Sequence, residues 1–212
     1  DIRQLRDADN GVGIYSVARG LTPYWHGAAV FERTDTMAWE SRATITESAT
    51  VGSTTTTLGD WAGGNVFDET NSVEVNVGAG TLSSATRDEV LQDRTVNSIL
   101  VGDEVLQYCV ATATGAGTYL VTRLLRKRLG TDRLTTGQPA GSRFVLLQPP
   151  GMRRVPQAVV DLMAVRYFKG VSLGRPLSTA ATQPVVNRGV SVTPLAPVNA
   201  RANRNSADTG IT

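Results

Sequence analysis

The sequence has little of the two residue types that most often bind metals or carry out catalysis. It contains one cysteine, Cys109, and one histidine, His26. A single cysteine excludes a disulfide within the chain, and a zinc site of cysteine and histidine needs about four ligands. Histidine catalysis would rest on His26 alone. We therefore expect no catalytic residue, no cofactor and no bound metal, and we expect His26 at the surface.

Charged residues and long apolar runs are also scarce. Charged residues make up 19% of the chain, below the roughly 25% of an ordinary soluble domain. Because 21 Lys+Arg nearly balance 19 Asp+Glu, nothing in the net charge of +2 indicates binding to nucleic acid or to a membrane surface. We expect no sequence-specific nucleic-acid binding. No apolar run approaches the roughly 18 residues of a membrane-spanning helix, so no transmembrane segment is expected.

The residues that are abundant favour β-strands. The chain has 26 threonines and 25 valines, with 21 glycines and 9 prolines to separate short strands. Threonine and valine are branched at Cβ, which suits strands better than helices. The composition predicts a mainly all-β fold, an antiparallel barrel or sandwich with long loops and few or no helices. Its low charge suggests that part of the surface is covered in an assembly, and a self-sufficient β domain is the alternative.

Alternation of apolar and polar residues predicts most of the strands. Val73, Val75 and Val77 fall on one face of a strand over residues 72–77. Glycine turns at residues 78–80 and 115–117 lack the helix and lysine of a phosphate-binding loop, so they are predicted as hairpin turns. Other predicted elements are a hairpin at 27–47, a short helix or turn at 85–92, a long strand at 98–114 kinked at Gly102, and strands at 49–58, 118–126, 142–148, 162–168 and 185–192.

The predicted domain organisation is one β domain over residues 1–198, or two small packed β subdomains over about 20–150 and 151–198. Residues 199–212 have no apolar periodicity and are predicted as a linker or C-terminal tail that leads to further modules. The charged opening of the chain and its polar tail suggest a segment of a larger protein.

Two pairs of adjacent acids are candidates for glycoside hydrolysis. They are Asp68 with Glu69 and Asp103 with Glu104. Neighbours on one strand point to opposite faces, so neither pair forms a catalytic dyad by itself. A dyad formed across two strands is the alternative to acids in solvated turns and at strand edges. We expect no enzymatic activity.

Five residues are candidate contacts for a partner protein or a glycan. Tryptophan rings can stack on sugar rings, and Trp25 and Trp61 are candidates for such a surface; the alternative is that both anchor loops while Trp39 packs in the core. A basic run beginning at Arg123 could meet acidic groups of a partner subunit, with a solvated strand end as the alternative. The residues of this run predicted as contacts are Arg126, Lys127 and Arg128.

A series of short motifs over residues 99–132 carries a family resemblance. In order, they are Val101-Gly102-Asp103-Glu104, Gln107-Tyr108, the 115–117 glycine hairpin, Tyr119-Leu120, Leu124-Leu125-Arg126 and Gly130-Thr131-Asp132. The order resembles the phage tail-tip hub family, which includes the large hub protein of gene transfer agents and the host-specificity tail proteins of lambda-like siphophages. Flanking pieces at residues 25–28, 67–82 and 191–198 also resemble it. One departure is Lys127, where the family usually has glycine.

The resemblance implies a structural role in a virion. Hub proteins of this family form trimers that close the distal end of the tail tube, connect it to fibres or host-recognition modules, and open for DNA ejection. The implied partners are a homotrimer of the chain, the distal tail protein, the tape-measure protein, and tail fibres or other baseplate proteins. A host surface receptor is a further partner in the alternative function, a receptor- or carbohydrate-binding module of a tail. A virion glycan hydrolase is the third alternative.

Overall fold

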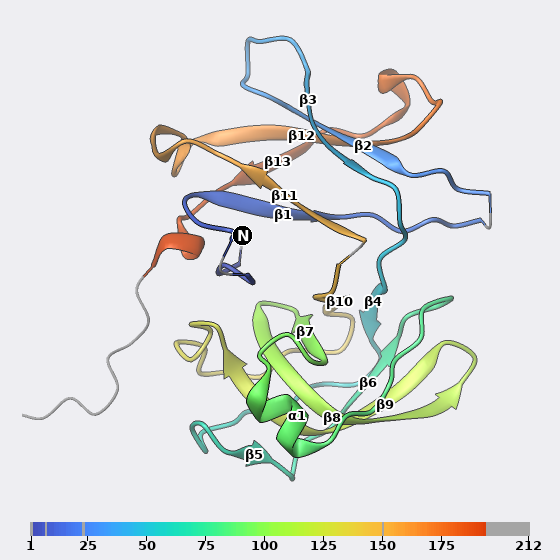
Figure 1. The fold of residues 1–212 in the computed structure, drawn as a ribbon, viewed down its shortest axis with the longest axis vertical. Helices are drawn as coiled ribbons and strands as arrows, with labels where there is room; N and C mark the ends of the chain where they lie inside the picture. Colours follow the sequence, from blue (N-terminus) through green and yellow to red (C-terminus); the bar gives the residue numbers. More distant parts are fainter. Residues whose placement is uncertain (1, 7, 23, 150, 194–212) are drawn as a thin grey trace, which may run out of the picture.

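The middle of the chain folds into a closed antiparallel β-barrel, the lower part of Figure 1. The computed structural model describes residues 2–6, 8–22, 24–149 and 151–193. Around the barrel the strands run in the order β4 (Val51–Thr54), β6 (Val73–Asn76), β9 (Thr118–Arg128), β8 (Glu104–Gly115), β7 (Ser98–Val101) and β10 (Arg143–Leu146). Because β10 pairs with both β7 and β4, this ring of strands has no open edge. We call residues 49–147 the barrel unit.

Apolar side chains from every strand around the ring except β4 fill the barrel. Val73, Val75 and Val77 are fully buried, which confirms the predicted face of this strand. Tyr108 and Phe144 are the largest apolar side chains of the same cluster, and both have no solvent exposure. The short strand β5 (Phe67–Asp68) pairs with β9 beyond the end of β6 and brings Asp68 to the barrel wall.

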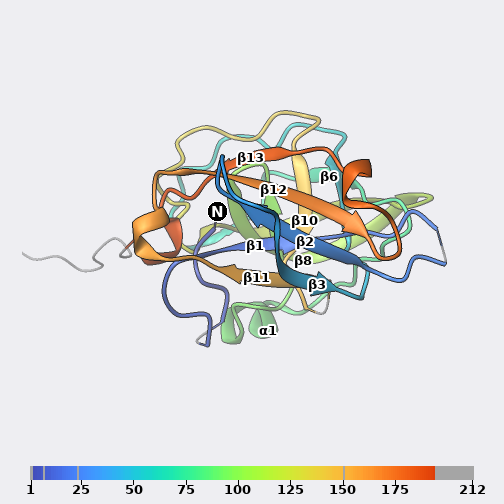
Figure 2. The same cartoon turned by 90° about the horizontal axis from the view of Figure 1, so that it is seen from above.

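The two ends of the described chain build a second unit above the barrel. β1 (Gly13–Val17) pairs with β11 (Met152–Pro156), and this ribbon packs beneath a sheet in the order β13–β12–β2–β3 (Figures 1 and 2). The sheet strands are β2 (Ala28–Arg33), β3 (Glu40–Ile45), β12 (Val165–Ser172) and β13 (Gln183–Val186). Ile14 and Val155 of the ribbon meet Val30, Ile45 and Phe168 of the sheet. We call residues 12–48 and 151–193 the sandwich unit.

A third apolar cluster joins the two units. Ile2 and Leu5 of the N-terminal segment and Met152 of the sandwich unit pack against Leu100 and Val105 of the barrel. The chain crosses from the sandwich to the barrel near Ala49 and returns near Gly151, where a Cβ on Gly151 would lie 2.5 Å from the Ala49 backbone. The two crossings therefore lie side by side.

In the part of the chain that the structure describes, helical structure is limited to short pieces. α1 (Arg87–Gln92) begins with a capping box, in which Thr86 and Glu89 bond to each other's backbone N–H groups, and its Val90 packs on Cys109 and Leu125. Three 3-10 turns are η1 (Val159–Asp161), η2 (Leu177–Thr179) and η3 (Val190–Val192). Among the described residues, no helix is long and apolar enough to cross a membrane.

The fold confirms the predicted all-β class, the helix predicted at 85–92 is present as α1, and the glycine turn at 115–117 joins β8 to β9 as a hairpin. The glycine turn at 78–80 is present, but its prediction as a hairpin turn is wrong, because the chain after it forms no strand before α1. The single strand predicted over residues 98–114 is wrong, because Gly102 has φ +58° and the chain reverses there between β7 and β8. The strands predicted at 162–168 and 185–192 are each right only in part. Residues 165–168 lie in β12 and 185–186 in β13, whereas 162–164 form a turn and bend and 190–192 form η3. The strands β1 and β11 were not predicted.

The predicted domain boundaries stay predictions. The sandwich unit combines segments from before and after the barrel in the sequence. The linker predicted over residues 199–212 lies outside the described residues.

Candidate functional site

A β-bulge in β9 places an arginine inside the barrel wall. Leu125 lies opposite Gln107 of β8, whereas Arg128 lies opposite Val105, so β9 has one extra residue in this interval. Lys127 in the bulge has φ +56°, a left-handed conformation. A bulge of this kind changes the direction of the adjacent side chains. Arg126 is turned into the wall, and its side chain has no solvent exposure.

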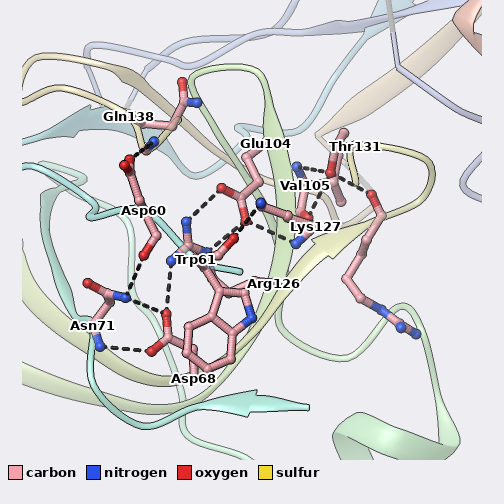
Figure 3. A network of polar contacts seen from close by, with 12 residues as sticks. Asp60, Trp61, Asp68, Asn71, Glu104, Val105, Arg126, Lys127, Thr131 and Gln138 are labelled. Atoms are coloured by element: carbon pink, nitrogen blue, oxygen red, sulfur yellow. Dashed lines mark hydrogen bonds and ion pairs between the residues drawn. The ribbon is translucent and has the colours of Figure 1, made fainter. Parts of the chain in front are cut away.

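Arg126 joins two buried carboxylates from different strands (Figure 3). Its Nε and Nη2 donate to the two oxygens of Glu104 at 2.7 and 2.8 Å, the bidentate geometry that arginine favours. Its Nη1 donates to Asp68 Oδ2 at 2.9 Å, and Nη2 also donates to the carbonyl of Gly59 at 3.1 Å. We call Asp68, Glu104 and Arg126 the buried triad.

Further donors form hydrogen bonds with both carboxylates. Asp68 accepts from the backbone N–H groups of Thr70 and Asn71 at 3.0 and 2.9 Å and from Asn71 Nδ2 at 2.8 Å. Burial alone would raise the pKa of Asp68, but hydrogen bonds from Asn71, Thr70 and Arg126 outweigh it and lower this pKa. Burial likewise opposes the charge on Arg126, yet Glu104 and Asp68 raise its pKa. The Lys127 N–H also donates to Glu104 Oε1, at 2.9 Å.

The loop that begins at Gly59 covers the triad and forms a small cavity beside it. The cavity has a volume of about 260 Å³, and its lining includes Trp61, Asn65, Arg126 and Lys127. The Lys127 ammonium donates to the carbonyl of Trp61, and the indole N–H donates to the carbonyl of Gly64 at 3.4 Å. Figure 3 shows the Trp61 ring beside Arg126.

Three of the five predicted contact residues line this cavity, and a fourth bonds to its rim. Trp61, Arg126 and Lys127 line it, and Arg128 Nη1 donates to Asn65 Oδ1 at 2.8 Å. Arg126 differs from the prediction of a partner contact, because its side chain is buried and its donors meet carboxylates of its own chain. For Arg126, the alternative of a solvated strand end is wrong for the same reason, whereas Arg123 of the same run is exposed.

Trp25 lies elsewhere. It packs at the edge of the sandwich core and lines a separate cavity of about 530 Å³ with Arg19 and several threonines. The core position predicted for Trp39 is wrong, because the ring is half-buried with Arg33 Cζ 4.8 Å and Lys169 Nζ 5.1 Å from its centroid. His26 is exposed, as expected.

In each predicted acid pair, one carboxylate is buried and its neighbour is exposed. Asp68 and Glu104 are buried, while Glu69 meets Arg87 and Asp103 meets Arg143 at 3.2 Å. The solvated position predicted for all four acids is therefore wrong for two of them. Asp68 and Glu104 do meet across strands, but both bond to Arg126 and both lack solvent exposure. This arrangement suits structural ion pairing, not proton transfer to a substrate.

Other residues of the motifs over 99–132 form hydrogen bonds that stabilise the barrel. Gln107 Nε2 donates to the carbonyls of Asp93 and Val96 at 2.9 and 2.8 Å, which ties the segment after α1 to β8. Thr131 Oγ1 donates to the Arg128 carbonyl at 2.7 Å and accepts from the Val105 N–H at 3.2 Å. Cys109 is buried, and burial raises the pKa of its thiol.

Comparison with known proteins gives one family. The chain is similar over residues 49–145 to the family described as Rcc01698-like, C-terminal. No curated protein matches the chain. The matched segment corresponds closely to the barrel unit and includes the complete buried triad.

Proposed function

We propose that the chain is a structural component of a siphophage-like or gene-transfer-agent tail-tip hub. In this role it closes the distal tail tube and connects it to fibres or host-recognition modules. The observation that supports the proposal is that residues of the 99–132 motifs have structural roles in the barrel. Glu104 and Arg126 form the buried triad, Gly102 makes the β7–β8 turn, and Thr131 fastens the chain after β9. Every one of these roles is architectural, as a non-enzymatic hub component requires.

The bulge accounts for the one departure from the family pattern. Lys127 stands where the resemblance expects glycine, and its φ is +56°. Glycine adopts this conformation without steric cost, whereas a residue with a Cβ does so at a cost of about 1 kcal/mol. The position thus has the backbone that a glycine would favour, and the departure leaves the turn intact.

The sandwich unit offers the edges through which subunits of a homotrimer could pair. β3 and β13 end the four-stranded sheet, and neither pairs with a further strand among the described residues. Unpaired edges are the usual sites of strand addition between chains. Light scattering during size-exclusion chromatography tests this part of the proposal, with three times the mass of 22.5 kDa expected.

Immunogold labelling of purified tailed particles tests the location. Gold at the distal end of the tail is expected, where the distal tail, tape-measure and other baseplate proteins would be neighbours. Gold absent from particles, with the protein free in the lysate, would contradict the proposal.

A receptor- or carbohydrate-binding module is the second candidate. The cavity beside Trp61 favours it, because an indole, the Lys127 ammonium and Asn65 surround one space of about 260 Å³. This function is tested by measuring the binding of the wild-type chain and of the Trp61→Ala variant to a glycan array. Binding that disappears in the variant would support this function, and absence of binding by both would remove it.

A further inference from the structure

Four arginines from distant parts of the sequence line one groove at the boundary between the two units. Arg3 comes from the N-terminal segment, Arg133 and Arg143 from the barrel unit, and Arg188 from the segment after β13. The groove has a volume of about 380 Å³ and contains a single carboxylate, Asp103, which pairs with Arg143. The lining therefore has an excess of three positive charges in a chain whose net charge is only +2.

One of these arginines has no structural task. Within the described part of the chain, the Arg133 side chain makes no hydrogen bond or ion pair, and the residue is exposed. Arg143, in contrast, donates to the Gly102 carbonyl at 3.0 Å and supports the β7–β8 turn. Positive charges that line one groove repel one another, and an anionic ligand between them reduces that repulsion.

Apart from Asp103 and Thr131, the rest of the lining is apolar. Leu100, Leu134 and Val186 lie among the arginines. An isolated phosphate would gain nothing from these side chains. A duplex nucleic acid needs an extended basic surface, which a short groove in a nearly neutral chain does not provide. A peptide with both acidic and apolar side chains would match both parts of the lining, since arginine binds carboxylates through two parallel hydrogen bonds.

We propose that this groove, called the arginine groove, binds an acidic and apolar peptide segment of a neighbouring protein. The volume lies within the range of about 300–1,000 Å³ that ligand sites occupy. This proposal goes beyond the tail-hub assignment and does not depend on it, because peptide binding can be measured with the purified chain whatever its location.

The first test is fluorescence anisotropy with a labelled peptide of alternating glutamate and leucine, titrated with the full chain. The matched probe replaces each glutamate by glutamine. We expect binding of the glutamate peptide, at least about tenfold weaker binding of the glutamine peptide, and loss of affinity as salt is raised. Equal binding of the two peptides, or binding of neither, would overturn the proposal.

Variants of single arginines test whether the peptide binds in the arginine groove. Arg133→Gln is expected to weaken the glutamate peptide at least about fivefold, because a charge-assisted hydrogen bond is lost. Arg175→Gln, an exposed arginine outside this lining, is the matched control and should leave affinity unchanged. Since Arg133 has no structural partner in the described chain, its variants should fold normally, and equal thermal unfolding midpoints will verify this.

Two further results would overturn the assignment. One is peptide affinity that Arg133→Gln leaves unchanged. The other is tighter binding of a single-stranded DNA of equal charge that shows the same dependence on Arg133, which would assign the groove to nucleic acid. Charge reversal gives an independent check, since Arg133→Glu should weaken the glutamate peptide more than Arg133→Gln does.

Discussion

The barrel unit and the sandwich unit each bury a carboxylate against arginine, but they do so with different access to water. In the barrel, the side chains of Glu104 and Arg126 are both 0% exposed. In the sandwich, the Glu32 side chain is 7% exposed, and its partners Arg42 and Arg166 are 33% and 19% exposed. The barrel therefore depends on complete pairing of its charges, whereas water can replace a lost partner in the sandwich.

The same contrast applies to strand edges. The barrel closes on itself, while the sheet of the sandwich unit ends at β3 and β13. Large exposed apolar side chains also gather in the sandwich unit, at Val159, Val160 and Met163 in the segment between β11 and β12. The comparison suggests that the barrel supplies stability and that the sandwich unit and its boundary supply contacts.

The largest effect is expected from Arg126→Met. Removing the guanidinium leaves Asp68 and Glu104 buried without a cation, which costs about 3–5 kcal/mol of unfolding free energy. Urea denaturation followed by tryptophan fluorescence measures the loss. The matched control is the triple variant Asp68→Asn, Glu104→Gln, Arg126→Met, which removes every charge of the triad and should recover part of the stability. A single variant as stable as the wild type would show that the triad does not stabilise the barrel.

Gly117→Ala should have the next largest effect. Gly117 has φ +71°, and a Cβ there would lie 2.1 Å from the carbonyl oxygen of Gly78. Left-handed strain and the backbone clash together should cost about 2–4 kcal/mol. Gly115→Ala is the control in the same turn, because its nearest atom would be 3.8 Å away. Thermal unfolding should separate the two variants, and equal midpoints would contradict the packing of the two glycine turns.

Much of the barrel could be predicted from the sequence because its signals are local. The alternation at Val73, Val75 and Val77 and the glycine turn before Thr118 each act within a few residues. The triad was missed because Asp68, Glu104 and Arg126 meet only after three strands have paired. The basic run that contains Arg126 gave no local sign that this arginine, unlike its neighbours, is buried.

The sandwich unit gave weaker signals for the same reason. β1 and β11 pair Gly13 with Pro156, positions separated by most of the chain. Each strand is only five residues long, too short for alternation to be distinctive. The half-buried position of Trp39 likewise depends on Lys169, which β12 brings beside β2.

A smaller effect is expected at the bulge of β9. Lys127→Ala keeps the left-handed strain and loses the ammonium bond to the Trp61 carbonyl, whereas Lys127→Gly loses the same bond but relieves the strain. The glycine variant should therefore be more stable than the alanine variant by about 1 kcal/mol. Chemical denaturation of the two proteins side by side measures the difference. An alanine variant at least as stable as the glycine variant would mean that the backbone at residue 127 is not left-handed.

The smallest effect is expected from Arg42→Ala in the sandwich unit. Arg42 pairs with Glu32 at 3.1 Å and donates to the Pro156 carbonyl at 2.8 Å, so it links β3 to the end of β11. Because Arg42 is partly exposed and Glu32 also accepts from Gln157 at 3.0 Å, the loss should be only about 0.5–1 kcal/mol. Raising the salt concentration should reduce it further, whereas the loss in Arg126→Met should change little. If Arg42→Ala cost as much as Arg126→Met, solvent access would not be what separates the two units.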